Sequence, residues 1–202
     1  MSFSQSFDDL VSALTCLPGV GAKSAQRIAL ELLLKRQEQA KILARAIDCA
    51  IENVRRCAQC RNLSDTEICL ICSNPKRNTQ HLCVVENPAD VLAIEQNTDY
   101  QGLYFVLMGH IAPLDGVGAQ ELGLDILDKR LASGEITELL IATNSTLEGE
   151  ATAYFLGELA QKHAVSATRP ANGVPMGGEL SYLDRNTLSF AFRSRQTFSV
   201  NS

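Results

Sequence analysis

The sequence predicts an α/β protein in three parts: a helical N-terminal region, a small module built on four cysteines, and a domain with a mainly parallel sheet. Three observations support this fold class. Apolar residues recur at helical spacing through residues 1–56. Four cysteines then fall within 16 residues, at 57–72. From residue 80 onward, short apolar segments alternate with helical patterns, which is typical of βαβ units.

The composition is that of a globular protein with a sizeable core. The chain has 202 residues, and 46% of them are hydrophobic. No apolar stretch approaches the roughly 20 residues that span a bilayer. The first residues, MSFSQSFDDL, carry two aspartates where an export signal would be basic. We therefore expect a soluble protein that stays in the cytoplasm, where its seven cysteines remain reduced or bind metal.

The charge is divided unevenly along the chain. The net charge of −5 by itself argues against a nucleic-acid partner. However, residues 1–77 carry 11 Lys and Arg against 8 Asp and Glu, a net charge of +3, whereas residues 78–202 carry 7 against 15, a net charge of −8. This asymmetry indicates two modules with different partners. The alternative is a chance fluctuation.

Three helices are expected in the N-terminal region, at 7–15, 22–35 and 39–56. Ser6 is the expected N-cap of the first helix, because Asp9 follows it at capping-box spacing. The third helix carries an apolar stripe, which consists of Ile42, Leu43, Ala46, Ile47, Ala50, Ile51 and Val54.

The segment LPGVGAKSAQRIALELL, at residues 17–33, contains the first candidate binding site. Gly19 and Gly21 allow the backbone a positive φ and leave bare N–H groups at the start of the second helix. Those donors suit a phosphate group, and Lys23 and Arg27 add positive charge one turn apart on the same face. This is the form of a helix-hairpin-helix, which binds the DNA backbone without reading sequence. The alternative is an ordinary helical hairpin with a glycine turn.

The most specific motif is Cys57-x2-Cys60-x8-Cys69-x2-Cys72. Each pair of cysteines in a tight turn places two thiolates about 2.3 Å from a metal, and two such turns complete a tetrahedron. Because all four ligands are cysteines, we expect a closed structural site with one Zn²⁺ per chain. The alternatives are two disulfides or four unrelated thiols. The remaining cysteines, predicted to be small core side chains, are Cys16, Cys49 and Cys83.

The rest of the sequence alternates between strands and helices. Strands are predicted at 82–86, 103–108, 136–143 and 165–169, and helices at 88–96, 119–134 and 148–164. Elements of these lengths in this order imply right-handed βαβ units and a mainly parallel sheet. The boundary with the preceding region is expected at residues 76–80.

Carboxylates follow two of the predicted strands. Glu86 comes after the first strand, and Glu148 and Glu150 follow the third. The carboxyl ends of parallel strands lie over the crevice where open α/β folds bind ligands, so these acids could hold Mg²⁺. The alternative is a set of solvated acids that complement a helix dipole. His110, in the loop after the second strand, is either a neighbour of Glu86 or a surface residue.

A Gly-rich segment, GVPMGGEL at 173–180, follows the last predicted strand. The chain has no Walker A pattern, so ATP binding has little support. Glu179 and Asp184 either imitate a Walker B acid or belong to a plain turn, and we favour the turn.

These motifs, in this order, resemble the RecR family of bacterial recombination mediators over nearly the whole chain. The residues that carry the resemblance are LPGVGAKSAQRIA, the cysteine quartet closing in CSNPKR, LCVVENPAD, VLMGHIAPLDGVGA, ATNSTLEGEATA and GVPMGGEL. The resemblance implies a helical helix-hairpin-helix region at 1–56, a four-Cys zinc finger at 57–72, a Toprim-like, mainly parallel α/β domain at 80–175 and a C-terminal assembly tail at 176–202.

The α/β part resembles the Toprim domains of topoisomerases, primases and related nucleases, with departures. Asn144 and Thr146 stand where type IA topoisomerases carry the aspartates that bind metal. An amide and a hydroxyl supply no anionic oxygen, so Mg²⁺ binding is weakened. The chain also has no domain with a tyrosine nucleophile. We therefore expect a scaffold used for binding rather than catalysis. The alternative is a metal-dependent nuclease or nucleotidyl transferase that uses Glu86, Glu148 and Glu150.

The resemblance also implies a function. Members of the family act with RecO and RecF to load RecA onto single-stranded DNA, in recombinational DNA repair that does not require RecBC. They form homo-oligomeric rings, tetramers or dimers, that bind single- or double-stranded DNA on the nucleoid.

The family's roles transfer to residues of this chain by position in the motifs. Lys23 and Arg27, beside the glycine turn, would contact DNA. Glu86, Glu148 and Glu150 would form an acidic patch that binds RecO.

Overall fold

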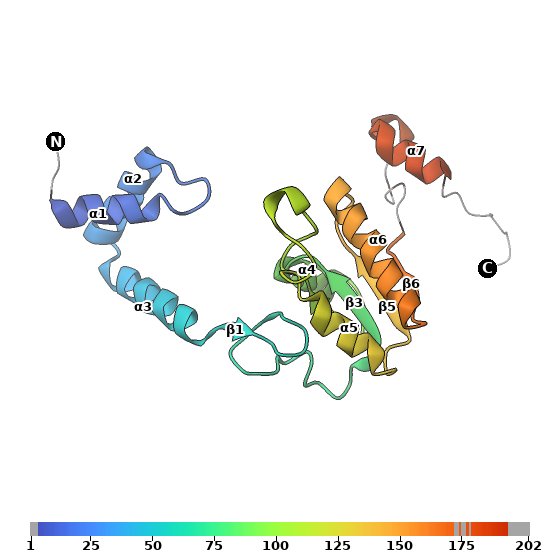
Figure 1. Cartoon of the computed structure of the whole chain (residues 1–202). Helices are drawn as coiled ribbons and strands as arrows, with labels where there is room; N and C mark the ends of the chain where they lie inside the picture. The colour runs from blue at the N-terminus through green and yellow to red at the C-terminus, as the bar shows by residue number, and fades with distance from the viewer. Residues whose placement is uncertain (1–3, 172–173, 175–176, 178, 194–202) are drawn as a thin grey trace. The chain divides into compact units, whose positions relative to one another are not determined.

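The structure, a computed structural model, describes residues 4–171, 174, 177 and 179–193 (Figure 1). The chain divides into two compact units, Met1–Val54 and Arg55–Ser202. The four-cysteine module therefore belongs to the larger unit, together with the α/β domain. Among the described helices, none combines the length and the apolar composition of a membrane-spanning segment.

The first unit contains the three predicted helices, α1 (Gln5–Leu14), α2 (Ala22–Leu34) and α3 (Gln37–Asn53) (Figure 1). The N-cap of α1 is Ser4, whose hydroxyl accepts a hydrogen bond from Phe7 N at 3.2 Å. The prediction that Ser6 caps this helix is wrong, because Ser6 lies inside its first turn.

The first unit buries little apolar surface by itself. α1 and α2 pack together and bury Phe7, Ala25 and Ala29. By contrast, α3 has no buried residue. Its predicted apolar stripe lies in the open, with Ile42 64% exposed and Ile51 75% exposed. An amphipathic helix of this kind normally packs its apolar face against another element.

The larger unit is built on a four-stranded parallel sheet in the order β4-β3-β5-β6. Its strands are β3 (Asn78–Val85), β4 (Gly102–Val106), β5 (Glu138–Ala142) and β6 (Ser166–Thr168), and its connecting helices are α4 (Pro88–Asn97), α5 (Leu124–Ala132) and α6 (Leu147–Lys162). The α/β prediction is confirmed. β3 begins before the predicted strand because its first residues pair with the start of β4.

Helices cover both faces of the sheet (Figure 1). On one face, side chains of β3, β4 and β5 form a cluster with α5 and α6, in which Phe105, Leu127 and Leu156 are fully buried. On the other face, Val85 and Tyr104 form a second cluster with Val91 of α4. The sheet is thus packed against helices on both faces, and this packing fixes the position of the carboxyl ends of its strands.

Some elements escaped prediction. They are the two-residue strands β1 (Arg55–Arg56) and β2 (Leu63–Ser64), the 3-10 turns η1 (Pro113–Asp115) and η2 (Leu180–Tyr182), and the C-terminal helix α7 (Arg185–Arg193). The start of α5 is also later than predicted, because Gly123, its N-cap, has a left-handed φ of 65°. Much of the Gly-rich segment 173–180 and residues 194–202 of the expected tail lie outside the described residues.

The start of α6 depends on a close approach of two backbone segments. Thr146 is the N-cap, and its hydroxyl accepts a hydrogen bond from Gly149 N at 3.1 Å. A Cβ at Gly149 would lie 2.0 Å from the carbonyl oxygen of Asn144. Only glycine therefore fits at this position of the helix.

We expect Gly149→Ala to lower the free energy of unfolding of the larger unit by about 2 kcal/mol, since the added methyl group must displace the backbone. Gly157→Ala is the matched control, because a Cβ at Gly157 meets open space in the same helix. The control should be neutral or stabilising by up to ~1 kcal/mol. Urea unfolding followed by tyrosine fluorescence measures both, since all four tyrosines lie at position 100 or beyond. Equal midpoints for the two variants would contradict the packing argument.

Candidate metal centre and nucleic-acid interface

The four cysteines lie on two tight turns that are bonded to each other. In the first turn, Cys57 N donates to Asn62 O at 2.8 Å, and in the link between the turns Ala58 N donates to Glu67 O at 2.8 Å. The antiparallel pair of β1 and β2 flanks the first turn. These backbone hydrogen bonds help to bring the cysteines of both turns near one another.

The sulfur atoms are arranged as a zinc site requires. The four Sγ atoms lie within 4.8 Å of one another, and those of Cys60 and Cys69 are 3.5 Å apart. A tetrahedral Zn²⁺ with Zn–S bonds of about 2.3 Å needs Sγ atoms roughly 3.8 Å apart. No disulfide joins any of the chain's cysteines, all of which lie in the described part. The disulfide alternative is therefore wrong.

The backbone around the cysteines favours thiolates. Cys69 N points to Cys57 Sγ at 3.3 Å, and Cys72 N points to Cys69 Sγ at 3.5 Å. Burial opposes ionisation of Cys57, but the amides of Cys69, Cys60 and Gln59 outweigh it and lower the pKa of the Cys57 thiol to about 7. Four mostly buried sulfur donors with no open coordination position suit one structural zinc ion, which they hold without a catalytic role.

The other cysteines follow the prediction only in part. Cys83 is fully buried in β3, as predicted. Cys16 and Cys49 are exposed, so their prediction as core residues is wrong. Both lie in the first unit, whose helices bury few side chains in the single chain.

The glycine turn between α1 and α2 leaves the start of α2 open. Gly19 has a left-handed φ of 77°, and Gly21 is the N-cap of α2, without a side chain to cap it. The first backbone bond of the helix runs from Ala25 N to Gly21 O at 2.9 Å. The amides of residues 22–24 precede that bond, so they are directed out of the N-terminal end, where the helix dipole favours an anion.

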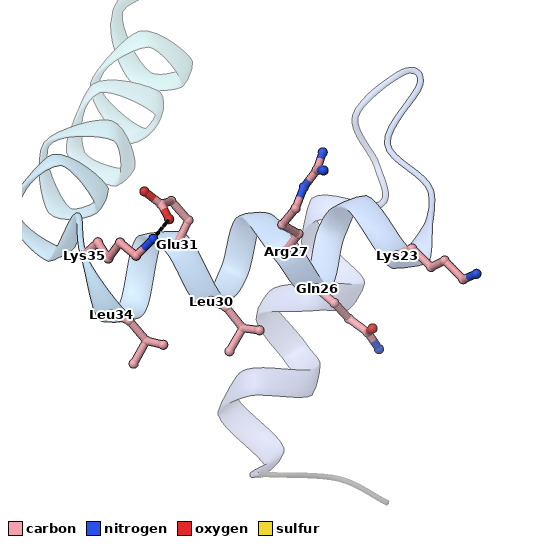
Figure 2. Close-up of a pocket in the computed structure, with 7 residues that line it drawn as sticks. All are labelled: Lys23, Gln26, Arg27, Leu30, Glu31, Leu34 and Lys35. Carbon is pink, nitrogen blue, oxygen red and sulfur yellow. Dashed lines mark ion pairs between the residues drawn. The ribbon is translucent and has the colours of Figure 1, made fainter.

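Lys23 extends into solvent from this end of α2, and Arg27 extends into solvent one turn further along the helix (Figure 2). Within the described residues, neither forms an ion pair with a carboxylate. At the other end of the helix, Glu31 pairs with Lys35 at 3.1 Å and with Arg36 at 3.3 Å. On α2, the cations without an ion pair thus lie in the first two turns, near the uncapped amides.

The same face of α2 is hollowed into an open groove of about 450 Å³ (Figure 2). Lys23 and Arg27 line it together with Gln26, the apolar side chains of Leu30 and Leu34, and the ion pair of Glu31 with Lys35. Leu34 is 73% exposed. The groove therefore combines cations that could meet an anion with exposed apolar side chains.

Glu86, at the carboxyl end of β3, is buried, and its carboxylate accepts hydrogen bonds from a neighbouring loop. Its side chain is 3% exposed. Its carboxylate accepts hydrogen bonds from Asn144 N at 2.8 Å and from Asn144 Nδ2 at 2.7 Å. His110 Nδ1 lies 3.4 Å from the same carboxylate, so His110 is indeed a neighbour of Glu86. Glu86 therefore ties the loop after β5 and the loop after β4 to the end of β3.

The expected patch of three carboxylates is not formed, so that expectation must be corrected. Glu86 is buried and cannot lie on an exposed patch. Glu150 forms two hydrogen bonds of 2.8 Å with the guanidinium of Arg169, which lowers the pKa of the Glu150 carboxyl. Glu148 is exposed at the start of α6, and no hydrogen bond or ion pair of its carboxylate is found within the described residues.

The side chains that replace metal-binding aspartates also have structural partners. Asn144 donates to Glu86, and the hydroxyl of Thr146 caps α6. The donor set that remains here has one buried carboxylate already satisfied by an amide, which is a poor set for Mg²⁺. Within the residues that the structure describes, the four cysteines form the one cluster of three or more metal-ligating side chains.

Arg61, next to Cys60, is a residue that sequence reasoning missed. Its side chain is buried against the α/β domain, where Nη2 donates to Glu121 O at 2.9 Å. Its only signal in the sequence is its place beside a zinc ligand, and nothing local to it indicates a partner 60 residues away.

We expect Cys60→Ser to reduce bound zinc from about one equivalent per chain to nearly none, because the serine hydroxyl is a poor zinc ligand and leaves only three thiolates without a fourth strong donor. Elemental analysis of the purified variant measures this. Cys16→Ser, which changes an exposed cysteine in the first unit, should keep the full zinc content. Zinc retained in the first variant, or lost in the second, would contradict the assignment.

Comparison with known families accounts for nearly all of the chain. Residues 7–51 match the model of the RecR helix-hairpin-helix, residues 54–74 that of the RecR zinc finger domain with four cysteines, residues 80–171 that of the Toprim domain and residues 173–196 that of the RecR C-terminal region. The matched segments follow one another in the order of the structural elements described above.

Curated relatives cover almost the full length. "Recombination protein RecR" of Dichelobacter nodosus is 65% identical over 198 residues, 98% of this chain and 98% of the relative. The proteins of the same name from Xanthomonas axonopodis and Xylella fastidiosa are 55% and 54% identical over 188 residues, 93% of this chain and 95% of each relative. None of these names is that of an enzyme. The chain belongs to the RecR family of recombination proteins.

Proposed function

We propose that this protein is a recombination mediator that binds DNA and, with RecO and RecF, helps to load RecA onto single-stranded DNA. One observation carries the DNA-binding part of the proposal: Lys23 and Arg27 have no carboxylate partner within the described residues, and they flank the uncapped amides at the start of α2. Backbone amides and cations in this arrangement suit phosphate oxygens. The protein would act in recombinational repair independent of RecBC, on the nucleoid in the cytoplasm.

We expect the protein to bind DNA without sequence specificity, because the proposed contacts are to phosphate groups. Phosphate contacts fix position on DNA but carry no sequence information. Gly19 and Gly21 have no side chain, and the space where a Cβ would stand at each is open, so the backbone of single- or double-stranded DNA can approach the turn at these two residues. Binding through such contacts releases counterions and depends steeply on salt.

We expect Lys23→Ala combined with Arg27→Ala to weaken DNA binding and to reduce the slope of log K against log salt concentration by roughly 1.5. A fluorescence anisotropy titration over a range of salt concentrations measures both quantities. Lys41→Ala is the control, since Lys41 is exposed on α3 and already paired with Glu38. An unchanged slope in the double variant would remove α2 from the DNA interface.

We further propose that the chain forms a homo-oligomeric ring, a tetramer or a dimer, in which α3 lies at an interface. The argument rests on the exposed apolar stripe of α3 and on the small core of the first unit. A unit of about 50 residues that buries so few side chains is marginal alone and is commonly stabilised by oligomerisation. A second copy of the chain supplies a matching apolar face.

We expect Ile47→Asp combined with Ile51→Asp to lower the oligomeric state, because the charges would be buried in the proposed interface. Size-exclusion chromatography with light scattering gives the mass as a multiple of the 21.9 kDa chain. Leu114→Asp, at a fully exposed leucine of the larger unit, should leave the mass unchanged. If the unaltered protein, the double variant and the control all had the same number of chains, α3 would not lie at the interface.

RecO is the proposed partner of an acidic residue in the larger unit. Of the three acids first considered, Glu148 is the exposed one for which no partner is found within the described residues, so the contact is assigned to Glu148. Charge complementarity with a basic partner supports this assignment. A pull-down in which Glu148→Lys retained RecO fully would rule it out.

A further inference from the structure

The strand β4 forms one edge of the sheet. An edge strand presents a row of backbone groups without a neighbouring strand, which invites pairing with another extended chain. Leu107 N, just past the end of β4, donates to Val85 O of β3 at 2.9 Å. Since backbone groups alternate in direction along a strand, those of Gly102, Tyr104 and Val106 face away from β3.

The first cysteine turn lies along the outer side of β4, which has no neighbouring strand. Val106 N donates a hydrogen bond to Cys60 O at 2.8 Å. Tyr104 O accepts from Arg130 Nη1 at 3.2 Å, and the same Nη1 group lies 3.3 Å from Gln59 O. Two successive carbonyl groups of the zinc-binding turn are therefore bonded, directly or through Arg130, to the outward positions of β4.

The second cysteine turn and the segment after it cover the rest of the edge. Arg77, which follows the module, donates to Gly102 O at 3.3 Å. Ile71, between Cys69 and Cys72, packs both against the cysteine cluster and against the sheet cluster that contains Tyr104. Each outward position of β4 thus has a partner supplied by the module, by Arg77 or by Arg130.

Arg61 fastens this cover to the domain. Its side chain lies over the ring of Phe105, with Cζ 5.9 Å from the centroid, and Nη2 donates to Glu121 O. The space for its guanidinium exists because residue 123 is glycine: a Cβ there would lie 1.9 Å from Arg61 Nη1. Arg61 is therefore matched at this contact to two residues far along the chain, Glu121 and Gly123.

The contact is costly as well as specific. Nη1 of Arg61 is buried, and no hydrogen-bond partner for it is found among the described residues. The backbone of Arg61 also has a left-handed φ of 64°, which is unfavourable for an arginine. A conformation with these penalties persists only while the turn around Cys57 and Cys60 is held rigidly. Because both cysteines are zinc ligands, bound zinc would supply this rigidity.

We propose that the zinc-bound module is a removable cover of the β4 edge, fastened by Cys60 O and Arg61, and that release of zinc uncovers this edge while the sheet stays folded. Thermodynamic linkage makes the coupling reciprocal. If zinc stabilises the cover, then weakening the contact of Arg61 with the domain must weaken the retention of zinc.

Hydrogen exchange at residue resolution on the full chain tests the first half. After removal of zinc with a chelator, the Val106 amide should exchange at least about tenfold faster, because its partner Cys60 O is lost. The Leu107 amide is an internal control, since it is bonded to Val85 O inside the sheet, and its exchange should change less than about twofold. Unchanged exchange at Val106 would overturn the proposal, and so would an equal loss of protection at both amides.

The rate of zinc release to a colorimetric chelator tests the second half. Arg61→Asn removes the guanidinium but tolerates the left-handed backbone, so it should release zinc at least about fivefold faster than the unaltered protein. Arg61→Lys, which keeps a cation that can reach Glu121 O, should restore part of the difference. Lys76→Asn, at an exposed lysine just after the second cysteine turn, is the control and should release zinc at the original rate. Equal rates for all of these proteins would overturn the proposal.

Discussion

The hydrogen bond from Val106 N to Cys60 O, with the buried Arg61 beside it, joins the zinc-binding turns to the sheet. Because of this junction, the four-cysteine module and the α/β domain form one compact unit rather than two. The zinc ion then does more than organise a short loop. In the proposed arrangement it holds the carbonyl group of Cys60 at Val106 and the guanidinium of Arg61 at Glu121 O, and so the position of the first cysteine pair matters to residues far along the chain.

The two units differ in how their charges are used. In the first unit, the cations at the start of α2 have no carboxylate partner in the described part of the chain, whereas those at its end are paired with Glu31. In the larger unit, Glu150 is paired with Arg169 and Glu86 is buried against Asn144. The cations at the start of α2 are therefore available to an anionic ligand, although the first unit as a whole is neutral, while part of the acidic surplus of residues 78–202 is used to hold the Toprim domain together.

The sequence predicted correctly those structural features that depend on residues close together in the chain. The helices, the parallel strands and the cysteine pairs are encoded by local spacing, and the structure confirms them. Contacts between distant residues were not predictable in the same way. The burial of Glu86 depends on the register that brings Asn144 beside β3, and the site of Arg61 depends on the glycine at position 123. The exposure of α3 was not predictable for another reason. Its apolar stripe shows that the helix needs a packing partner, but it does not show which surface provides that partner.

The most direct test of this account is the unfolding of the larger unit at a series of buffered free zinc concentrations, followed by tyrosine fluorescence. If zinc holds the module against the sheet, the free energy of unfolding should rise by about 1.4 kcal/mol for each tenfold increase in free zinc above the dissociation constant. This dependence should disappear when the cysteine site is destroyed. A denaturation midpoint that is the same with and without zinc would contradict the account.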